Sequence, residues 1–409
     1  MRSHCVILGL IGLISAVSAA PPPPPPPPPG PPGPPSIPQS EPHHQPPPPP
    51  PHHSVRPWST FAENVIFQPD DKHSVLYPRQ VELSDGTLLA TTSYSGDQPP
   101  YFPIFRSTDG GATWSWFSNL TDQVNGLGMS AQPALAELPF AVGDFPAGTV
   151  LASGNSWGSH STNIDLYASK DKGRTWKFVS NVARGSGPDT TNGNPCIWEP
   201  FIEFFNHTVG VFYSDQRDPL HGQKLAHQES MDLKSWGAVI DDVAYLNYTA
   251  RPGMTVITYI PPIQKWILAH EFPGGESWSG AGYPVYYRMA DSPFDFRFAY
   301  GVPIMVNGVQ PSSSPYVVWS PVGGPNGTII VSDADHSGVF TNRASGQPDQ
   351  WELHDTPQPP AYSRSLHVFS KNPDHLMLLG AGVFGGETNL PLYLSVVSVS
   401  ETLKKPGRE

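Results

Sequence analysis

The chain has 409 residues, a formal net charge of −12, 14% charged residues and 11% aromatic residues. Typical soluble domains carry roughly 25% charged residues, so a charge-rich helical bundle or a coiled coil is disfavoured. The negative charge also disfavours nucleic acid, anionic membrane surfaces and polyanionic polysaccharides as partners, and we expect a neutral partner instead.

The first 19 residues have the features of a secretory signal peptide. Arg2 precedes an apolar run over residues 6–17, and small residues follow at positions 18–20. The run is too short and wrongly flanked for a membrane-spanning helix, so we expect cleavage after Ala19 and a secreted, extracellular protein. Four Asn-x-Ser/Thr sequons fit a glycosylating secretory route and are predicted N-glycosylation sites: Asn119, Asn206, Asn247 and Asn326.

The segment from residue 20 to residue 57 is dominated by proline, since 22 of the chain's 52 prolines lie between Pro21 and Pro57. Such a segment cannot pack a core, and we predict a disordered linker that acts as an extended polyproline II spacer. We interpret its paired histidines, His43–His44 and His52–His53, as solvated linker residues, with loose metal binding as the alternative. No metal motif occurs elsewhere, so we predict no metal and no cofactor.

Residues 58–409 are numerous enough for one large domain or two ordinary ones. Cys5 leaves with the signal peptide, so Cys196 is left alone and no internal disulfide can form. We interpret Cys196 as a buried inert thiol beside Ile197 and Trp198, with a reactive thiol as the alternative.

A pattern of two apolar strands joined by a turn recurs six times in this domain at fairly regular intervals. The six copies are Arg79–Ala90, Pro133–Gly154, Trp198–Ser214, Pro252–His270, Pro315–Ser332 and Ser365–Gly380. Long helical periodicity is absent. Repeats of this length predict an all-β fold, a six-bladed, sialidase-like β-propeller over residues 58–409, with two packed β-sandwiches as the alternative.

A second repeated motif supports the propeller. Ser107–Trp114 and Ser169–Trp176 both match the Asp-box pattern S-x-D-x-G-x-T-W and lie one blade-length apart, while residues 230–236 and 290–294 are weaker copies. The Asp should accept backbone N–H groups inside a tight turn and the Trp should pack into its blade. We therefore predict structural roles for Asp109, Trp114, Asp171 and Trp176.

In a propeller, the starts of the innermost strands, the ends of the second strands and the connections between blades all lie on one face. The Asp-box turns lie on the opposite face, so we look for the active site away from them. The polar and aromatic residues expected to bind substrate on the first face are Arg79, Asn155, Trp157, Trp198, Asp215, Arg217, Arg251 and Arg364. Its carboxylates are Glu199, Glu271, Asp333 and Asp335.

Glu199 and Glu271 fall on adjacent predicted blades, and each follows an aromatic or apolar stretch. Glycoside hydrolysis uses such a pair, in which one carboxyl protonates the leaving oxygen and the other attacks the sugar or activates water. The alternative is that either glutamate is a structural ion-pair partner of Arg217 or Arg251. Position alone does not decide between these interpretations.

Four stretches of the central region carry a more specific pattern: Trp198–Phe201, Tyr213–Asp218, Gly222–Leu225 and Arg251–Met254. Together with the Asp-boxes, which the sialidase superfamily shares, they resemble fungal glycoside hydrolase family 93 over most of residues 75–400. The resemblance implies a retaining exo-α-1,5-L-arabinanase that releases arabinobiose from neutral arabinan, which we expect to act as a monomer. It also implies Glu199 and Glu271 as catalytic residues. We assign Glu199 as nucleophile and Glu271 as acid/base, with the reverse assignment as the alternative.

Two other functions stay open from sequence. In a sialidase, Arg79, Arg251 and Arg364 would cluster to clamp the carboxylate of the substrate. In a non-catalytic carbohydrate-binding propeller, sugars would stack on aromatic residues without turnover, and the candidates are Trp157, Trp278 and Trp319.

Overall fold

The computed structural model describes residues 56–277, 279–386 and 389–404. Contacts divide the chain into residues 1–53 and 54–409, and every described residue lies in the second unit. The predicted signal peptide, nearly all of the predicted linker and Trp278 therefore lie outside the described residues. No helix in the described part is both long enough and apolar enough to span a membrane.

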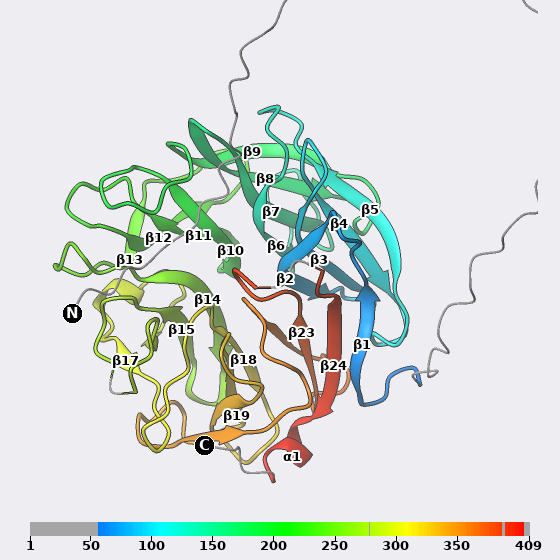
Figure 1. Cartoon of the computed structure of the whole chain (residues 1–409), viewed down its shortest axis with the longest axis vertical. Helices are drawn as coiled ribbons and strands as arrows, with labels where there is room; N and C mark the ends of the chain where they lie inside the picture. The colour runs from blue at the N-terminus through cyan, green and yellow to red at the C-terminus, as the bar shows by residue number, and fades with distance from the viewer. Residues whose placement is uncertain (1–55, 278, 387–388, 405–409) are drawn as a thin grey trace, which may run out of the picture. The chain divides into compact units, whose positions relative to one another are not determined.

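The described residues form six four-stranded antiparallel sheets arranged around a common axis (Figure 1). Blade 1 contains β2 (Ser74–Glu82), β3 (Leu88–Ser95), β4 (Tyr101–Ser107) and β5 (Ser115–Thr121). Blade 2 contains β6 (Ala131–Glu137), β7 (Val150–Gly158), β8 (Ser161–Ser169) and β9 (Lys177–Gly185). Blade 3 contains β10 (Ile197–Phe205), β11 (Thr208–Asp215), β12 (Lys224–Ser230) and β13 (Ile240–Val243).

The second half of the ring repeats this arrangement. Blade 4 contains β14 (Gly253–Ile260), β15 (Lys265–Glu271), β16 (Val285–Ala290) and β17 (Val302–Pro303). Blade 5 contains β18 (Tyr316–Ser320), β19 (Thr328–Ser332), β20 (Val339–Asn342) and β21 (Trp351–His354). Blade 6 contains β22 (Ser365–Val368), β23 (His375–Gly380), β24 (Leu392–Ser398) and β1 (Phe61–Phe67). The helical elements described are η1 (Pro261–Ile263), η2 (Phe296–Phe298) and α1 (Val399–Thr402).

The six-bladed propeller predicted from sequence is thus confirmed, and the alternative of two packed sandwiches is wrong. Each of the six predicted strand pairs matches the first two strands of one blade. The first strands of neighbouring blades contact one another, which places them innermost.

The sequence analysis missed the strand that closes the ring. β1 pairs antiparallel with β24, with Phe61 opposite Val396 and Phe67 opposite Leu392. The outermost strand of blade 6 therefore comes from the beginning of the domain and the other three from its end. The Asn64 side chain also donates to the backbone carbonyl of Gly111 at 2.9 Å, which ties this strand to blade 1.

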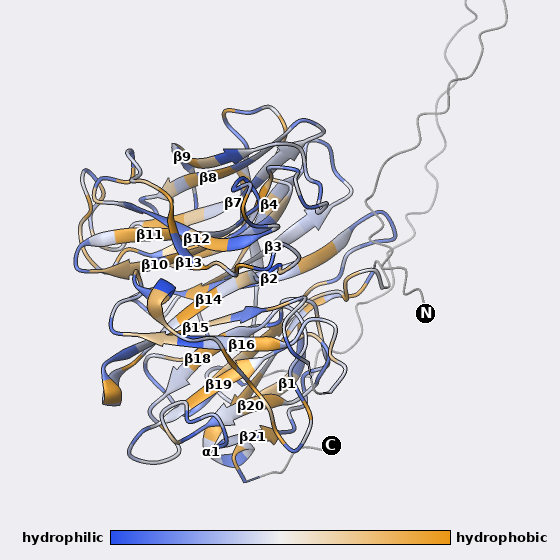
Figure 2. Cartoon of the chain, turned by 90° about the vertical axis from the view of Figure 1, so that its left-hand side faces the viewer, coloured by the Kyte–Doolittle hydropathy of each residue, from blue (hydrophilic) through white to orange (hydrophobic). Residues whose placement is uncertain are grey.

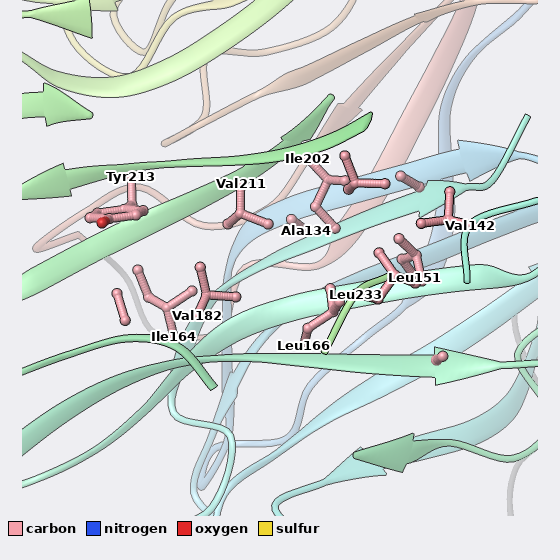
Figure 3. Packing of buried hydrophobic residues seen from close by; sticks show 14 of the residues in the cluster. Ala134, Val142, Leu151, Ile164, Leu166, Val182, Ile202, Val211, Tyr213 and Leu233 are labelled. Atoms are coloured by element: carbon pink, nitrogen blue, oxygen red, sulfur yellow. The ribbon is translucent and has the colours of Figure 1, made fainter. Parts of the chain in front are cut away.

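Apolar side chains between neighbouring blades form the core. Figure 3 shows one such cluster, in which Ile164, Leu166 and Val182 of blade 2 face Val211 and Tyr213 of blade 3. Burying a side chain of this size contributes roughly 1.5–3 kcal/mol, so the inter-blade clusters make the ring rigid. Along the strands the hydrophobic residues appear as short stretches, for example in β14 and β19 (Figure 2).

The Asp-box turns have the geometry expected from sequence and lie between the third and fourth strands of their blades. Asp171 accepts hydrogen bonds from the backbone N–H of Thr175 at 2.8 Å and from its hydroxyl at 2.6 Å. Trp176 is buried and lies in the core of blades 1 and 2. Blade 5 has an equivalent turn that the sequence analysis missed, because Asn342 takes the place of the first Ser of the motif and Ala344 that of the Asp. Like Ser107 and Ser169, Asn342 accepts the N–H groups two and four residues further on, here those of Ala344 and Gly346.

Candidate active site

Glu199 and Glu271 meet beside strand β14. Glu199 lies near the start of β10, Glu271 is the last residue of β15, and both are partly buried. A Cβ atom added to Gly253 would lie 3.3 Å from Oε1 of Glu271 and 3.4 Å from Oε2 of Glu199. Both oxygens are measured from the same Cβ position, so the distance between the two oxygens is at most the sum of these two distances. The two carboxyls predicted from sequence thus face one small space.

The Glu199 carboxyl is held through its Oε2 atom. Its Oε2 accepts hydrogen bonds from the hydroxyl of Ser214 at 2.7 Å and from the backbone N–H of Met254 at 2.8 Å. Burial raises the pKa of Glu199, whereas these two hydrogen bonds and the charge of Arg251 act in the opposite direction. The net effect is a raised pKa, and the two hydrogen bonds to Oε2 and the charge of Arg251 limit the rise.

The Glu271 carboxyl is held in the same way by the following blade. Its Oε2 accepts the backbone N–H of Ser314 at 2.8 Å and the hydroxyl of Ser313 at 3.3 Å. Burial, followed by the negative charge of Glu199, raises the pKa of Glu271 to about 7. Since the negative charge of Glu199 contributes to the raised pKa of Glu271, Glu199 ionises first and Glu271 keeps its proton to near neutral pH, which is the division of roles that acid/base chemistry needs.

A repeated backbone distortion shapes this end of the propeller. At the start of each innermost strand, or just before it, lies a residue with positive φ: Tyr77, Gln132, Glu199, Met254, Ser314 and Ser363. In blades 1 to 4 this residue falls within a shift of the pairing register between the first two strands. Such bulges redirect side chains and are common beside active sites, and a non-glycine residue in this conformation costs roughly 1–3 kcal/mol.

Arg251 organises the polar side of the site. Its guanidinium donates to the side-chain oxygens of Asn192, Gln216 and Gln223. The same oxygen of Gln223 accepts the indole N–H of Trp198 at 3.1 Å. Gln223 therefore links two residues predicted to bind substrate, and its own role was missed by the sequence analysis although it lies inside a motif of the family resemblance.

Two tyrosines, Tyr77 and Tyr362, also lie near the carboxyl pair. The rings of Tyr77 and Tyr362 lie 6.1 Å apart in an edge-to-face arrangement. Burial raises the pKa of both hydroxyls, and the negative charges of Glu199 and Glu271 raise them further, which places these tyrosines within electrostatic range of the pair. The sequence analysis passed over both, since it searched for carboxylates, arginines and tryptophans.

The Arg79 guanidinium packs over tyrosine rings. Its guanidinium carbon is 4.0 Å from the centre of the Tyr77 ring and 5.2 Å from that of Tyr316. Its Nη1 donates to the carbonyl of Ser363 at 3.2 Å. Arg79 is buried, so its charge acts on Glu199 through space.

Two residues predicted to bind substrate are fully buried and have hydrogen-bond partners within the fold. Arg364 is completely buried and its guanidinium donates to backbone carbonyls of Ser337, Gly338 and Gln358. It therefore does not join Arg79 and Arg251 in a carboxylate-binding cluster. Asn155 is also fully buried, and its amide donates to the carbonyl of Ile197 at 2.9 Å, so it ties blade 2 to blade 3.

The remaining predicted residues surround the site. Asp215 and Arg217 form an ion pair at 2.7 Å, and substrate binding by either residue stays a prediction. Trp157 is half-buried and packs edge-on against Trp198, with ring centres 6.5 Å apart. Asp333 accepts the backbone N–H of Ser312 at 2.8 Å and so supports the serines that hold Glu271, whereas Asp335 is exposed.

Residues on other parts of the surface complete the comparison with the sequence. The indole N–H of Trp319 donates to the carbonyl of Asn326 at 3.0 Å, in the turn between β18 and β19, so it packs locally. The side chains of three sequons, Asn119, Asn206 and Asn247, are exposed, and Asn326 is partly buried.

One group of potential metal ligands occurs among the described residues: Asp218, His221 and Asp241. The ammonium group of Lys224 lies 2.8 Å from Asp218 and 2.7 Å from Asp241. The lysine already supplies the positive charge that a cation would bring, so this group is best described as an ion-pair network.

The propeller with Asp-box turns and a carboxylate pair at its axis defines a protein of the sialidase-like glycosidase class. Among solved structures, a family 93 α-L-arabinofuranosidase of Fusarium graminearum, in complex with arabinobiose, is 44% identical with a TM-score of 0.82, and the match covers 84% of this chain and 99% of that one. An α-L-arabinanase of Penicillium chrysogenum, also with arabinobiose, is 41% identical with a TM-score of 0.80 and the same coverage. The chain belongs to glycoside hydrolase family 93 and is a glycoside hydrolase.

More distant structures share the fold alone. The Hadza microbial sialidase Hz136 is 11% identical with a TM-score of 0.52, and the match covers 80% of this chain and 66% of that one. A leech intramolecular trans-sialidase is 12% identical with a TM-score of 0.51, over 84% of this chain and 71% of that one. Searches of protein-family profiles and of curated proteins gave no match.

Proposed function

We propose that the protein is a secreted, retaining exo-α-1,5-L-arabinanase that releases arabinobiose, with Glu199 as nucleophile and Glu271 as acid/base. The observation that carries the proposal is the pair of carboxyls beside Gly253, with different electrostatic environments. The substrate is inferred from the two relatives above 40% identity, both of which were solved with arabinobiose.

The first step joins the sugar to the enzyme. Glu271 donates its proton to the oxygen of the leaving arabinan chain while a carboxylate oxygen of Glu199 attacks the anomeric carbon, so the glycosidic bond breaks and a glycosyl ester forms. The raised pKa of Glu271 keeps that proton available in mildly acidic solution. The hydrogen bonds from Ser214 and Met254 lower the pKa of Glu199 against the effect of burial and so favour the carboxylate that attacks.

The second step reverses the role of Glu271. Now ionised, it removes a proton from water as the water attacks the anomeric carbon, and the ester bond to Glu199 breaks. Once Glu199 is esterified it no longer carries the negative charge that raises the pKa of Glu271. Glu271 is therefore more readily deprotonated in the intermediate, which suits its second role as a base.

The spacing of the carboxyls supports retention of configuration. Retaining enzymes place their carboxyls about 5–5.5 Å apart, whereas inverting enzymes leave roughly 6.5–9.5 Å for a water molecule. The distances of 3.3 Å and 3.4 Å from the Gly253 Cβ position together limit the separation of Oε1 of Glu271 and Oε2 of Glu199. That limit is compatible with the shorter separation of retaining enzymes and so supports retention.

The arrangement of arginines favours a neutral sugar over a sialoside. A substrate carboxylate needs free guanidinium groups, but Arg364 binds backbone carbonyls and Arg79 lies on two tyrosine rings. The net charge of −12 also opposes binding of an acidic sugar. We therefore prefer arabinan to the sialoside that a sialidase would cleave.

The deciding experiment incubates the enzyme with linear α-1,5-arabinan and, in parallel, with a sialoside. Chromatography of early time points should reveal arabinobiose as the main product, and proton NMR should detect the retained anomer first. Glu199→Gln and Glu271→Gln should abolish release. The matched control is Glu203→Gln, on the same strand as Glu199, which should remain active. A ladder of longer products would refute exo action, and binding without turnover would refute the enzyme assignment.

Secretion and the monomeric state are part of the same proposal and are tested separately. A secreted, processed chain should have a mature N-terminus at Ala20, which N-terminal sequencing of protein from the culture medium would reveal. Treatment with an endoglycosidase should lower its apparent mass if the sequons carry glycans. Sedimentation of the purified protein should give the mass of one chain.

A further inference from the structure

We propose that Gln132 is a positioning residue for Glu199, as one link in a ring of hydrogen bonds that joins the blades at the active site. The inference rests on the proposed function, because it assigns Gln132 a part in placing the nucleophile. It concerns a residue outside the carboxylate pair.

The central observation is a contact between the bulges of blades 2 and 3. Oε1 of Gln132 accepts a hydrogen bond from the backbone N–H of Glu199 at 3.0 Å. Both residues have positive φ, 57° for Gln132 and 63° for Glu199. The amide of Gln132 therefore binds the backbone of Glu199 at the residue whose conformation sets the direction of the catalytic side chain.

The same type of link recurs around the ring. Ser93 of blade 1 accepts the N–H of Gln132 at 2.8 Å, and Glu199 accepts the N–H of Met254 at 2.8 Å. Glu271 of blade 4 then accepts the N–H of Ser314 at 2.8 Å. Two further hydrogen bonds extend the ring through blades 5 and 6 to blade 1. The backbone N–H of Ser363 donates to Oγ of Ser314 at 2.9 Å, and Nη1 of Arg79 donates to the carbonyl of Ser363 at 3.2 Å.

This ring gives a physical reason for the positive φ of the bulges. In blades 2 to 6 the backbone N–H of the positive-φ residue binds an acceptor on the preceding blade rather than an atom of its own sheet. Both catalytic carboxyls are acceptors in the ring through Oε2. Gln132 is the neutral acceptor immediately before them, and it fixes Glu199 from the backbone side while Met254 fixes it from the carboxyl side.

Loss of the Gln132 acceptor should therefore affect chemistry more than substrate binding. Without it, the Glu199 N–H has no acceptor in a partly buried site and the strained conformation loses a support. Displacing a catalytic group by about 1 Å can cost 10²-fold in rate. A residue that only held the fold together would lower stability and leave the rate of the remaining folded enzyme unchanged.

The test compares Gln132→Met, which has similar length but no acceptor, with Gln132→Glu, which keeps the acceptor oxygen. For Gln132→Met we expect kcat on linear arabinan to fall about 10- to 100-fold with little change in KM. Gln132→Glu should recover activity at acidic pH, where its carboxyl is neutral. Ser93→Ala is the control. It removes the acceptor of the Gln132 N–H, so it should lower the stability of the hydrogen-bonded ring while kcat stays close to that of wild type.

Several outcomes would overturn the inference. They are a normal kcat in Gln132→Met, a rise in KM with kcat unchanged, or an equal loss of kcat in Ser93→Ala and Gln132→Met. If Gln132→Met does not fold, Gln132→Asn replaces it, because an amide shortened by one methylene cannot reach the Glu199 N–H and the same kcat loss is expected. Inactive wild-type enzyme on arabinan would instead refute the proposed function, so the two failures are distinguishable.

Discussion

The backbone N–H of Ser314 donates a hydrogen bond to Oε2 of Glu271 at 2.8 Å, so the last residue of β15 is held by the following blade. The contact orients Glu271 but does not keep it ionised, because burial and the charge of Glu199 still raise its pKa to about 7. The proton-donating group of the site is thus fixed in position while its ionisation depends on Glu199. This dependence can be measured.

The pH dependence of the enzyme should report the two glutamates. The pKa of Glu271 is raised, so the protonated form that donates to the leaving group is present below about pH 7 and lost above it. We expect the alkaline limb of kcat/KM near pH 7. Removal of the Glu199 charge in Glu199→Gln should lower the pKa of Glu271, measured by NMR titration of labelled glutamate.

Glu203→Gln is the control for this titration. Glu203 lies on β10 with Glu199, and burial raises its own pKa to about 8. The main causes of the raised pKa of Glu271 are burial and the charge of Glu199, and Glu203 is not among them. An unchanged Glu271 pKa in Glu199→Gln would contradict the electrostatic coupling of the pair.

Chemical rescue should separate the roles of the two carboxyls. Loss of an acid/base typically lowers rates by about 10²–10⁴-fold. With an activated aryl arabinobioside, Glu271→Gln should still form the glycosyl ester, and added azide should attack it to give a glycosyl azide of retained configuration. Glu199→Gln cannot form the ester, so azide should attack the substrate directly and give the inverted azide. The opposite pattern would exchange the roles of Glu199 and Glu271.

Arg364→Lys should damage stability and spare catalysis. The Arg364 guanidinium is fully buried and donates to carbonyls of Ser337, Gly338 and Gln358, and a lysine cannot reproduce this forked geometry. Each hydrogen bond from a charged group is worth about 1.5–3 kcal/mol, so denaturant unfolding should reveal at least one such loss. A rise in KM with unchanged stability would instead restore Arg364 as a substrate-binding residue.

Asp171→Ala, in an Asp-box turn on the face away from the active site, should also lower stability and leave catalysis unchanged. The Asp171 carboxylate accepts the N–H and the hydroxyl of Thr175, and its removal leaves both donors without that acceptor. We expect a loss of about 1–3 kcal/mol in the free energy of unfolding, with unchanged kcat on arabinan. Asp349→Ala, at an exposed position, is the control. Loss of activity in folded Asp171→Ala would argue against a purely structural Asp-box.

Strand patterns and Asp-boxes were sufficient to predict the propeller, because blade structure is determined by local alternation and turn chemistry. The closing strand β1 could not be predicted, since its pairing with β24 joins the two ends of the domain. The glutamate pair could be predicted because topology alone places the starts of the innermost strands and the ends of the second strands on the same face. The partners of Arg364 and Asn155 depend on side-chain direction, which the strand pattern does not specify.

The bulges did leave a signal in the sequence. Proline follows the positive-φ residue in four blades, at Pro78, Pro133, Pro200 and Pro315. Proline has no N–H and is tolerated in a strand interior mainly at edges or bulges, so its recurrence at the start of an inner strand indicates a bulge. Gln132 could have been found in this way, as the residue before Pro133.

Gly253→Ala should narrow the space between the catalytic carboxyls. The added Cβ would lie 3.2 Å from Nε2 of Gln223, 3.3 Å from Glu271 and 3.4 Å from Glu199, so at least one side chain must move. A misplacement of about 1 Å can cost 10²-fold, whereas contacts of this length require a shift of a few tenths of an ångström, so we expect kcat/KM on linear arabinan to fall by about 10-fold. Gly237→Ala is the matched control, since its nearest neighbour would be the Glu229 carbonyl at 3.6 Å. Equal activity in both variants would contradict the geometry proposed for the pair.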